Sequence, residues 1–205
     1  MSDPSQPFRP APAAAADAAE PLAVNVPAYA GTLAPPVPAR IRQLRRNLAE
    51  SMRDARTLKR PAKATDAAMD EPTGFAGTVA RAACALCRGW CCSRGGEHAY
   101  LDGPSMARIR RTRPELDAWG ILRLYTQAVA DPAYADSCVF HGAQGCTLDR
   151  SLRADLCNRY FCTGLGALVK QVPPPRRAVV VAARGEIRRT SPVLSTDPEA
   201  GSRPG

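Results

Sequence analysis

The sequence has 205 residues, a net charge of +9 and an isoelectric point near 9.5. No stretch approaches the roughly 20 consecutive apolar residues of a membrane helix, so the composition excludes a transmembrane segment and predicts a soluble chain. The N-terminus has no basic region followed by an apolar core, so we expect no secretory signal and a cytoplasmic location. The basic charge suits an acidic partner, either nucleic acid or an anionic surface, although a composition rich in alanine, arginine and proline is also typical of GC-rich bacterial genomes.

The first part of the chain is predicted to lie outside the core. Residues 1–40 are rich in proline and alanine and contain few large apolar side chains, so we expect a disordered N-terminal tail. Residues 41–60 predict a basic amphipathic helix. Its apolar residues recur at helical spacing and are Ile41, Leu44, Leu48, Met52 and Ala55.

Two roles are open for this helix. It docks on an acidic protein or on nucleic acid, or it packs on the rest of the chain through its narrow apolar stripe. A polar linker follows at 61–74, and we expect residues up to about 70 to be dispensable to the core.

Residues 75–194 are predicted to form the folded domain, and residues 195–205 lack core residues and are predicted to be a second disordered tail. Helical spacing predicts one helix from Phe75 into the first cysteines and a second that begins at Pro104. A third helix is expected from Pro114. Its apolar face contains Leu116, Trp119, Leu122, Tyr125 and Val129.

The second half of this domain predicts short strands as well as helix. We expect a strand, a turn and a second strand between Cys138 and Cys146, and a hairpin at 177–194. Between them, helical spacing of Leu152, Leu156 and Tyr160 predicts another helix. The predicted fold class is therefore a small, mainly helical α+β domain with short strands or a hairpin. With so modest a core, a bound metal would add useful stability to this cysteine-rich domain.

All eight cysteines lie between positions 84 and 162. They are Cys84, Cys87, Cys91, Cys92, Cys138, Cys146, Cys157 and Cys162. In a reducing cytoplasm, clustered thiols are more often metal ligands or redox groups than disulfides. The Cys84-x2-Cys87 spacing lets two sulfur atoms reach one metal ion, and Cys91 adds a third one turn later. Cys92 must point elsewhere unless the backbone bends, so either two four-thiolate sites form or one site with spectator thiols.

The two cysteine segments, "CALCRGWCC" at 84–92 and "SCVFHGAQGCTLDRSLRADLCNRYFC" at 137–162, resemble the YkgJ-like cysteine-cluster family, whose domains are described as zinc- or iron-chelating. The second segment follows the family's order of a cysteine, an aromatic residue, a turn with Gly-Cys, an arginine and two final cysteines. Two departures stand out: Ala154 replaces the usual proline, and three residues rather than two separate Cys87 from Cys91.

The resemblance implies metal chelation by the eight cysteines and defines no reaction, so enzyme status stays open. We expect one or two zinc ions per chain, with an iron-sulfur cluster as the alternative. The function expected first is a metal-stabilised binding module. The alternatives are an iron-sulfur or zinc-dependent modification enzyme, because a protein methylase shows a similar cysteine pattern, and a metal-responsive, nucleic-acid-binding regulator.

Other side chains are candidates for supporting roles. His98 and His141 are candidate ligands or acid–base groups, although a histidine in a glycine-flanked loop is more often solvated. Arg150, Arg153 and Arg159 either offset the negative charge of thiolate clusters or form an ordinary charged surface.

Overall fold

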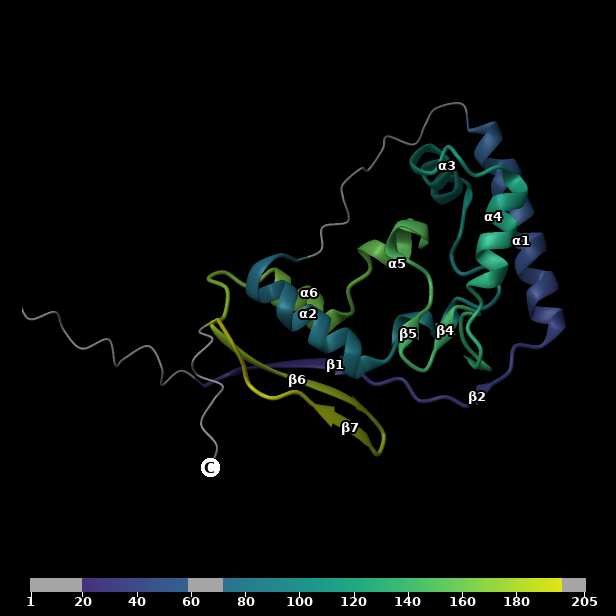
Figure 1. Ribbon diagram of the computed structural model, residues 1–205. Helices are drawn as coiled ribbons and strands as arrows, with labels where there is room; N and C mark the ends of the chain where they lie inside the picture. The colour runs from purple at the N-terminus through teal and green to yellow at the C-terminus, as the bar shows by residue number, and fades with distance from the viewer. Residues whose placement is uncertain (1–19, 59–71, 197–205) are drawn as a thin grey trace, which may run out of the picture.

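Two hydrophobic cores organise the chain, and the cysteine segments lie where they meet. The computed structural model describes residues 20–58 and 72–196 as a mixed fold of helices and short strands (Figure 1). We call the part whose core includes Val24 and Val180 the sheet lobe. We call the part whose core includes Leu44 and Phe140 the helical lobe.

The sheet lobe is built on a four-stranded sheet. Strand β1 (Leu22–Pro27) lies parallel to β6 (Arg177–Arg184), and the register places Val24 opposite Val180. Strands β7 (Ile187–Thr190) and β8 (Leu194–Ser195) pair antiparallel with β6. The predicted hairpin at 177–194 is thereby confirmed.

Two helices cover this sheet (Figure 1). Helix α2 (Gly74–Cys87) packs on β6, and α6 (Thr163–Val169) packs on β1. Alternate residues of each strand face the helices, as the period of a half-buried strand requires. The core between these layers is made of Val24, Val26, Ala28, Val79, Ala80, Ala83, Leu165, Leu168, Ala178, Val180 and Ala182.

The helical lobe packs three helices together. Helix α1 (Pro38–Thr57) contacts both α3 (Gly103–Thr112) and α4 (Ala118–Gln127), and lies beside α4 in Figure 1. The predicted apolar stripe of α1 is its buried face, because Leu44 and Leu48 are almost fully enclosed. This helix therefore packs on the rest of the chain, which is the second of the two roles considered above.

A second sheet and three short helices complete the helical lobe. Its strands follow one another in antiparallel order and are β2 (Leu33–Ala34), β3 (Ala133–Tyr134), β4 (His141–Gly142) and β5 (Gly145–Cys146). The short helices are η1 (Trp90–Arg94), η2 (Arg150–Leu152) and α5 (Asp155–Arg159). The strand, turn and strand expected between Cys138 and Cys146 are present as β4 and β5.

The expected disordered tail at residues 1–40 is wrong for residues 20–40. Strand β1 and the residues after it are core, with Ala28 and Tyr29 almost fully buried. The period-two run "LAVNVP" is short, and its parallel partner β6 follows at the far end of the chain, so local composition concealed it. Residues 1–19, most of the linker at 61–74 and most of the tail at 195–205 lie outside the described residues.

Two further expectations were wrong in detail. Trp119 belongs to the solvent-facing side of α4 and is 77% exposed, while Ile121 and Tyr125 form the buried face. The helix expected across Leu152, Leu156 and Tyr160 is divided into η2 and α5. The extended backbone at Arg153 and Ala154 separates them, so that Leu156 and Tyr160 are exposed rather than aligned with Leu152.

Candidate metal centre

The first cysteine segment begins on a helix and reverses sharply. Cys84 and Cys87 lie in the last turn of α2. The next two residues, Arg88 and Gly89, both have left-handed backbone angles, with φ values of 56° and 84°. The chain then enters η1, which carries Cys91 and Cys92. The Trp90 N–H points back and donates to the Cys87 sulfur at 3.3 Å, a type of contact that stabilises a thiolate.

His141 holds this reversal in place. Its Nε2 lies 2.7 Å from the Arg88 carbonyl oxygen, and its Nδ1 lies 2.8 Å from the Ser137 hydroxyl. Because a carbonyl only accepts, Nε2 carries the proton and Nδ1 accepts from Ser137. The ring is fully buried, and this burial lowers the pKa of His141 below its usual range.

Both histidine hypotheses can now be compared with the geometry. His141 is not the solvated loop histidine that its glycine-flanked position predicted, and both of its ring nitrogens are already hydrogen-bonded within the protein. It positions the cysteine loop instead of binding metal in this arrangement. His98 is exposed, as expected, and its Nδ1 accepts from the Tyr100 N–H at 2.9 Å.

The loop before β4 brings Cys138 against η1. The Cys138 N–H donates to the Cys92 carbonyl oxygen at 3.1 Å, and Val139 N–H donates to the Gly96 carbonyl oxygen at 3.0 Å. A Cβ atom placed on Gly95 would lie only 2.8 Å from the Cys138 Cβ, so this close approach requires a glycine. Cys146 in β5 stands opposite His141 in the register.

Residues from the supposed N-terminal tail brace the same loop. The Tyr29 hydroxyl donates to the Asp136 carboxylate at 2.8 Å. The Arg40 guanidinium donates to the backbone carbonyls of Ala135 and Ser137 and forms an ion pair with Glu97. Sequence reasoning missed both residues, because neither composition nor spacing connects them with cysteines about 100 residues away.

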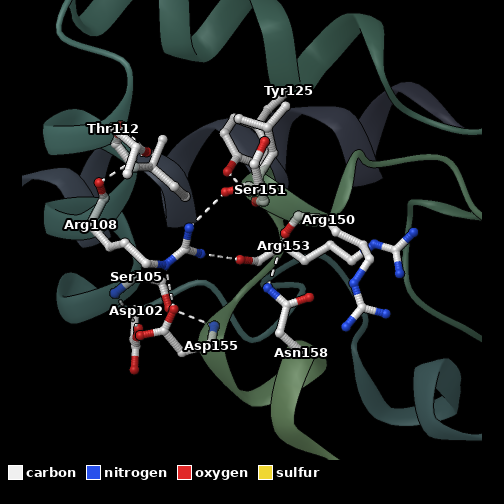
Figure 2. Close-up of polar contacts among 12 residues, drawn as sticks. Asp102, Ser105, Arg108, Thr112, Tyr125, Arg150, Ser151, Arg153, Asp155 and Asn158 are labelled. Carbon is white, nitrogen blue, oxygen red and sulfur yellow. Dashed lines mark hydrogen bonds and ion pairs between the residues drawn. The ribbon is translucent and has the colours of Figure 1, made fainter. Parts of the chain in front are cut away.

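Arg108 anchors the segment that leads into the last two cysteines (Figure 2). From α3, its guanidinium forms an ion pair with Asp155 at 2.6 Å and donates to the carbonyl oxygens of Ser151 and Arg153. Together these bonds fix η2 and the start of α5, which carries Cys157. Cys162 follows as the N-cap residue of α6.

The thiols differ in how far they are enclosed, and all eight are free cysteines. Cys138 is buried, with 7% of its surface exposed. The exposed cysteines are Cys84, Cys91 and Cys157, and the half-buried ones are Cys87, Cys92, Cys146 and Cys162. The cysteines also divide by core: Cys87 and Cys162 pack on the sheet-lobe core, whereas Cys92, Cys138 and Cys146 belong to or pack on the helical-lobe core.

The thiols influence one another's ionisation. Burial, followed by the charges of Cys91, Cys87 and Cys162, raises the pKa of Cys84 to about 11. Burial, followed by the charges of Cys146 and Cys91, raises the pKa of Cys157 to about 11. Both residues are exposed, and the charges that act on them come from cysteines of both segments.

Cys91 and Cys92 strongly influence each other's ionisation. The hydrogen bond from Cys92 stabilises the Cys91 thiolate and lowers the pKa of Cys91 to about 7. The same bond, with burial, raises the pKa of Cys92. Cys91 is therefore the thiol most easily ionised near neutral pH.

Two of the three candidate arginines affect the ionisation of the thiols. The Arg153 charge lowers the pKa of Cys91 and of Cys157, and the Arg150 charge lowers the pKa of Cys84. These two arginines lie close enough to offset thiolate charge. Arg159 lies exposed on α5.

The donor set suits a thiophilic metal, but the side chains are not arranged as a finished site. Among residues 20–58 and 72–196, no three histidine, cysteine, aspartate or glutamate side chains meet the geometry of a metal site. The thiol chemistry, the Trp90 N–H aimed at a sulfur and the nearby positive charges fit bound zinc or iron. Metal binding would therefore require cysteine side chains to turn toward one another.

Comparison of the chain with protein-family models, with curated proteins and with solved structures gives no match. No helix in the described part of the chain has the length and apolar character to cross a membrane.

Proposed function

We propose that this chain is a metal-chelating cysteine-cluster protein, in which thiolates bind zinc where the two lobes meet and produce a metal-stabilised binding module. The observation that supports it best is that cysteines packed on both cores gather at one junction, although they come from well-separated segments. Metal bound by these thiolates would stabilise the fold at the junction, because ligand binding free energy then becomes folding free energy.

The ligand chemistry favours zinc with cysteine donors. Four thiolates around a divalent ion leave a net charge of −2, which Arg150 and Arg153 are placed to offset. The same ligands suit iron-sulfur clusters, but the spacing of Cys84, Cys87 and Cys91 matches neither the bacterial nor the plant ferredoxin run. We therefore place zinc first, at one or two ions per chain, and an iron-sulfur cluster second.

The roles of the other candidates fit a structural metal centre. His141 uses both ring nitrogens to hold the loop between Cys87 and Cys91, so it organises ligands. The apolar face of α1 is already buried, so an acidic partner or nucleic acid would meet its exposed face, where arginines outnumber acidic residues. Neither observation calls for a catalytic role.

The test is elemental analysis combined with visible spectroscopy on full-length protein purified without oxygen. We expect a colourless protein with stoichiometric zinc, and a lower melting temperature once a chelator removes the metal. The Cys87→Ser variant should lose zinc and melting temperature together. Ser93→Ala, a substitution of a non-ligand in the same loop, is the matched control and should keep both.

Two results would overturn the zinc proposal. A brown protein with stoichiometric iron and acid-labile sulfide would establish the iron-sulfur alternative and make the modification enzyme the first function to test. A protein that holds no metal, and whose melting temperature does not change when the chelator is added, would exclude chelation altogether.

A further inference from the structure

The eight thiols divide into groups, and the first observation that separates them is the core on which each one packs. Cys87 and Cys162 lie against the apolar residues beneath β1 and β6. Cys92, Cys138 and Cys146 lie against the apolar residues between α1, α3 and α4. Packing alone therefore assigns five of the eight cysteines to one side or the other of the junction.

Hydrogen bonds add to this division. On the sheet-lobe side, the Trp90 N–H at the start of η1 donates to the sulfur of Cys87. On the other side, the Cys138 N–H donates to the Cys92 carbonyl oxygen, and the Gly95 backbone lies against the Cys138 side chain. Cys92 and Cys138 are thus held together by the backbone itself.

The remaining thiols are placed by their elements and contacts. Cys84 lies three residues before Cys87 in the last turn of α2, so the two side chains lie on one side of a helix that packs on β6. The Cys157 sulfur lies 4.0 Å from the carbonyl oxygen of Ala99, which belongs to the helical-lobe core. Cys84 therefore belongs with the sheet-lobe thiols, and Cys157 with the helical-lobe thiols.

Cys91 is the residue between the two groups. It lies in η1 beside Cys92, directly after the reversal at Arg88 and Gly89 that follows Cys87. Because its neighbour Cys92 is tied to Cys138, Cys91 is the thiol left to complete the sheet-lobe group. Each group then has the four thiolates that a closed zinc site requires.

We infer that the eight thiols form two separate four-thiolate metal sites joined through the adjacent residues Cys91 and Cys92. The first site comprises Cys84, Cys87, Cys91 and Cys162, and the second comprises Cys92, Cys138, Cys146 and Cys157. This inference rests on the proposed function, since it assigns ligands to the metal that the proposal invokes.

The two sites differ in accessibility. The first contains two of the three exposed cysteines, Cys84 and Cys91. The second contains the buried Cys138, and its other members Cys92 and Cys146 pack on the helical-lobe core. The first site therefore exchanges its metal with solution, whereas the second is structural and releases it slowly.

The test uses zinc alone, added to metal-free full-length protein, followed by zinc release to a chromogenic chelator. The wild type should retain two zinc ions and release them in a fast and a slow phase. The variants are made at exposed cysteines, so that folding is disturbed least. Cys84→Ser/Cys91→Ser should keep one zinc and only the slow phase, and Cys157→Ser should keep one zinc and only the fast phase.

A second double variant separates this arrangement from a single shared centre. Cys84→Ser/Cys157→Ser takes one ligand from each site and should retain neither zinc against the chelator. The within-site variant Cys84→Ser/Cys91→Ser removes the same number of thiols and should retain one. Equal zinc retention in the two double variants, or a single zinc in the wild type, would overturn the two-site assignment while leaving chelation intact. Absence of zinc from the wild type would overturn the proposed function itself.

Discussion

The loop between Cys87 and Cys91 depends on a single residue without a side chain. Gly89 has a left-handed backbone, and a Cβ atom there would lie 2.3 Å from the Nε2 atom of His141. His141 cannot retreat, because both of its nitrogens are bonded and its ring packs against Tyr29 and Tyr134. Gly89 therefore combines a conformational and a steric requirement.

We expect Gly89→Ala to destabilise the metal-free protein by more than the ~1 kcal/mol that a left-handed alanine costs. Gly96→Ala is the matched control, because Gly96 also has a left-handed backbone but open space around its Cβ position. Urea denaturation of both variants measures the difference. Equal losses of unfolding free energy would show that His141 does not constrain the loop.

The acidity of Cys91 gives a second prediction at this scale. In metal-free, reduced protein at pH 7.5, iodoacetamide should modify Cys91 faster than Cys84, because its pKa is about 7 whereas that of Cys84 is about 11. The Cys91 rate should rise as pH increases through about 7 and then level off. Mass spectrometry of the modified peptides assigns the sites. Modification of Cys84 first would contradict the thiol pairing of Cys91 with Cys92.

At the scale of elements, α6 reaches β1 only because Gly164 lacks a side chain. A Cβ atom on Gly164 would lie 1.8 Å from the Asn25 carbonyl oxygen, which belongs to the strand itself. The same helix contains Gly166, where a Cβ atom would meet nothing within 4 Å. Alanine substitutions at these two glycines therefore distinguish the effect of close packing from the effect of helix propensity within one helix.

We expect Gly164→Ala to destabilise the protein by about 1–3 kcal/mol, because the helix must move away from the sheet. Gly166→Ala should be neutral or stabilising by up to about 1 kcal/mol, because alanine favours helix. The denaturant midpoints of the two variants measure this difference in stability. A stable Gly164→Ala variant would mean that α6 does not lie so close to β1.

Local periodicity predicted some elements well and others poorly, for physical reasons. The helices at α1, α2 and α3 and the hairpin of β6 and β7 were predicted because their signals lie within a few consecutive turns or around Gly185. The short α6 was not predicted, because its seven residues include two glycines and give no sustained helical spacing. Strand β1 was missed because its hydrogen-bonding partner is β6, which no local window contains.

The candidate site shows the same limit. Cysteine spacing predicted the thiols as a group, because their chemistry is visible in composition. The supporting residues Arg40 and Arg108 carry no such signal, because their partners are backbone carbonyls of distant segments. His141 was considered as a ligand or acid–base group, but its bond to the Arg88 carbonyl has no local signal. The chain reverses within the "CRGWCC" run, where Arg88 and Gly89 have left-handed backbone angles, and the sequence analysis did not predict this reversal.

At the scale of the whole molecule, the two ends of the described chain close the sheet lobe. Strand β1 lies at one end and β6 near the other, with the cysteine segments in between. The residues after β1 continue into the second core, where Tyr29 and Arg40 hold the Cys138 loop. The N-terminal segment from residue 20 is therefore part of both lobes.

We expect a chain that begins at Pro38 to be strongly destabilised. It loses the buried Val24, Val26 and Tyr29, each contributing roughly 1.5–3 kcal/mol of burial free energy. A chain that begins at Glu20 retains β1 and is the matched control, with a melting temperature expected close to that of the full chain. Thermal melting by circular dichroism compares the two. An unchanged melting temperature for the Pro38 chain would contradict the role given to β1.

The central claim is that thiolates at the junction of the lobes bind the metal without other ligands. Zinc K-edge X-ray absorption on the full-length protein, purified without oxygen, measures this most directly. The account predicts a first shell made only of sulfur at about 2.3 Å, in the wild type and in the Cys84→Ser/Cys91→Ser variant alike. A first shell that contains nitrogen or oxygen in the wild type would contradict it.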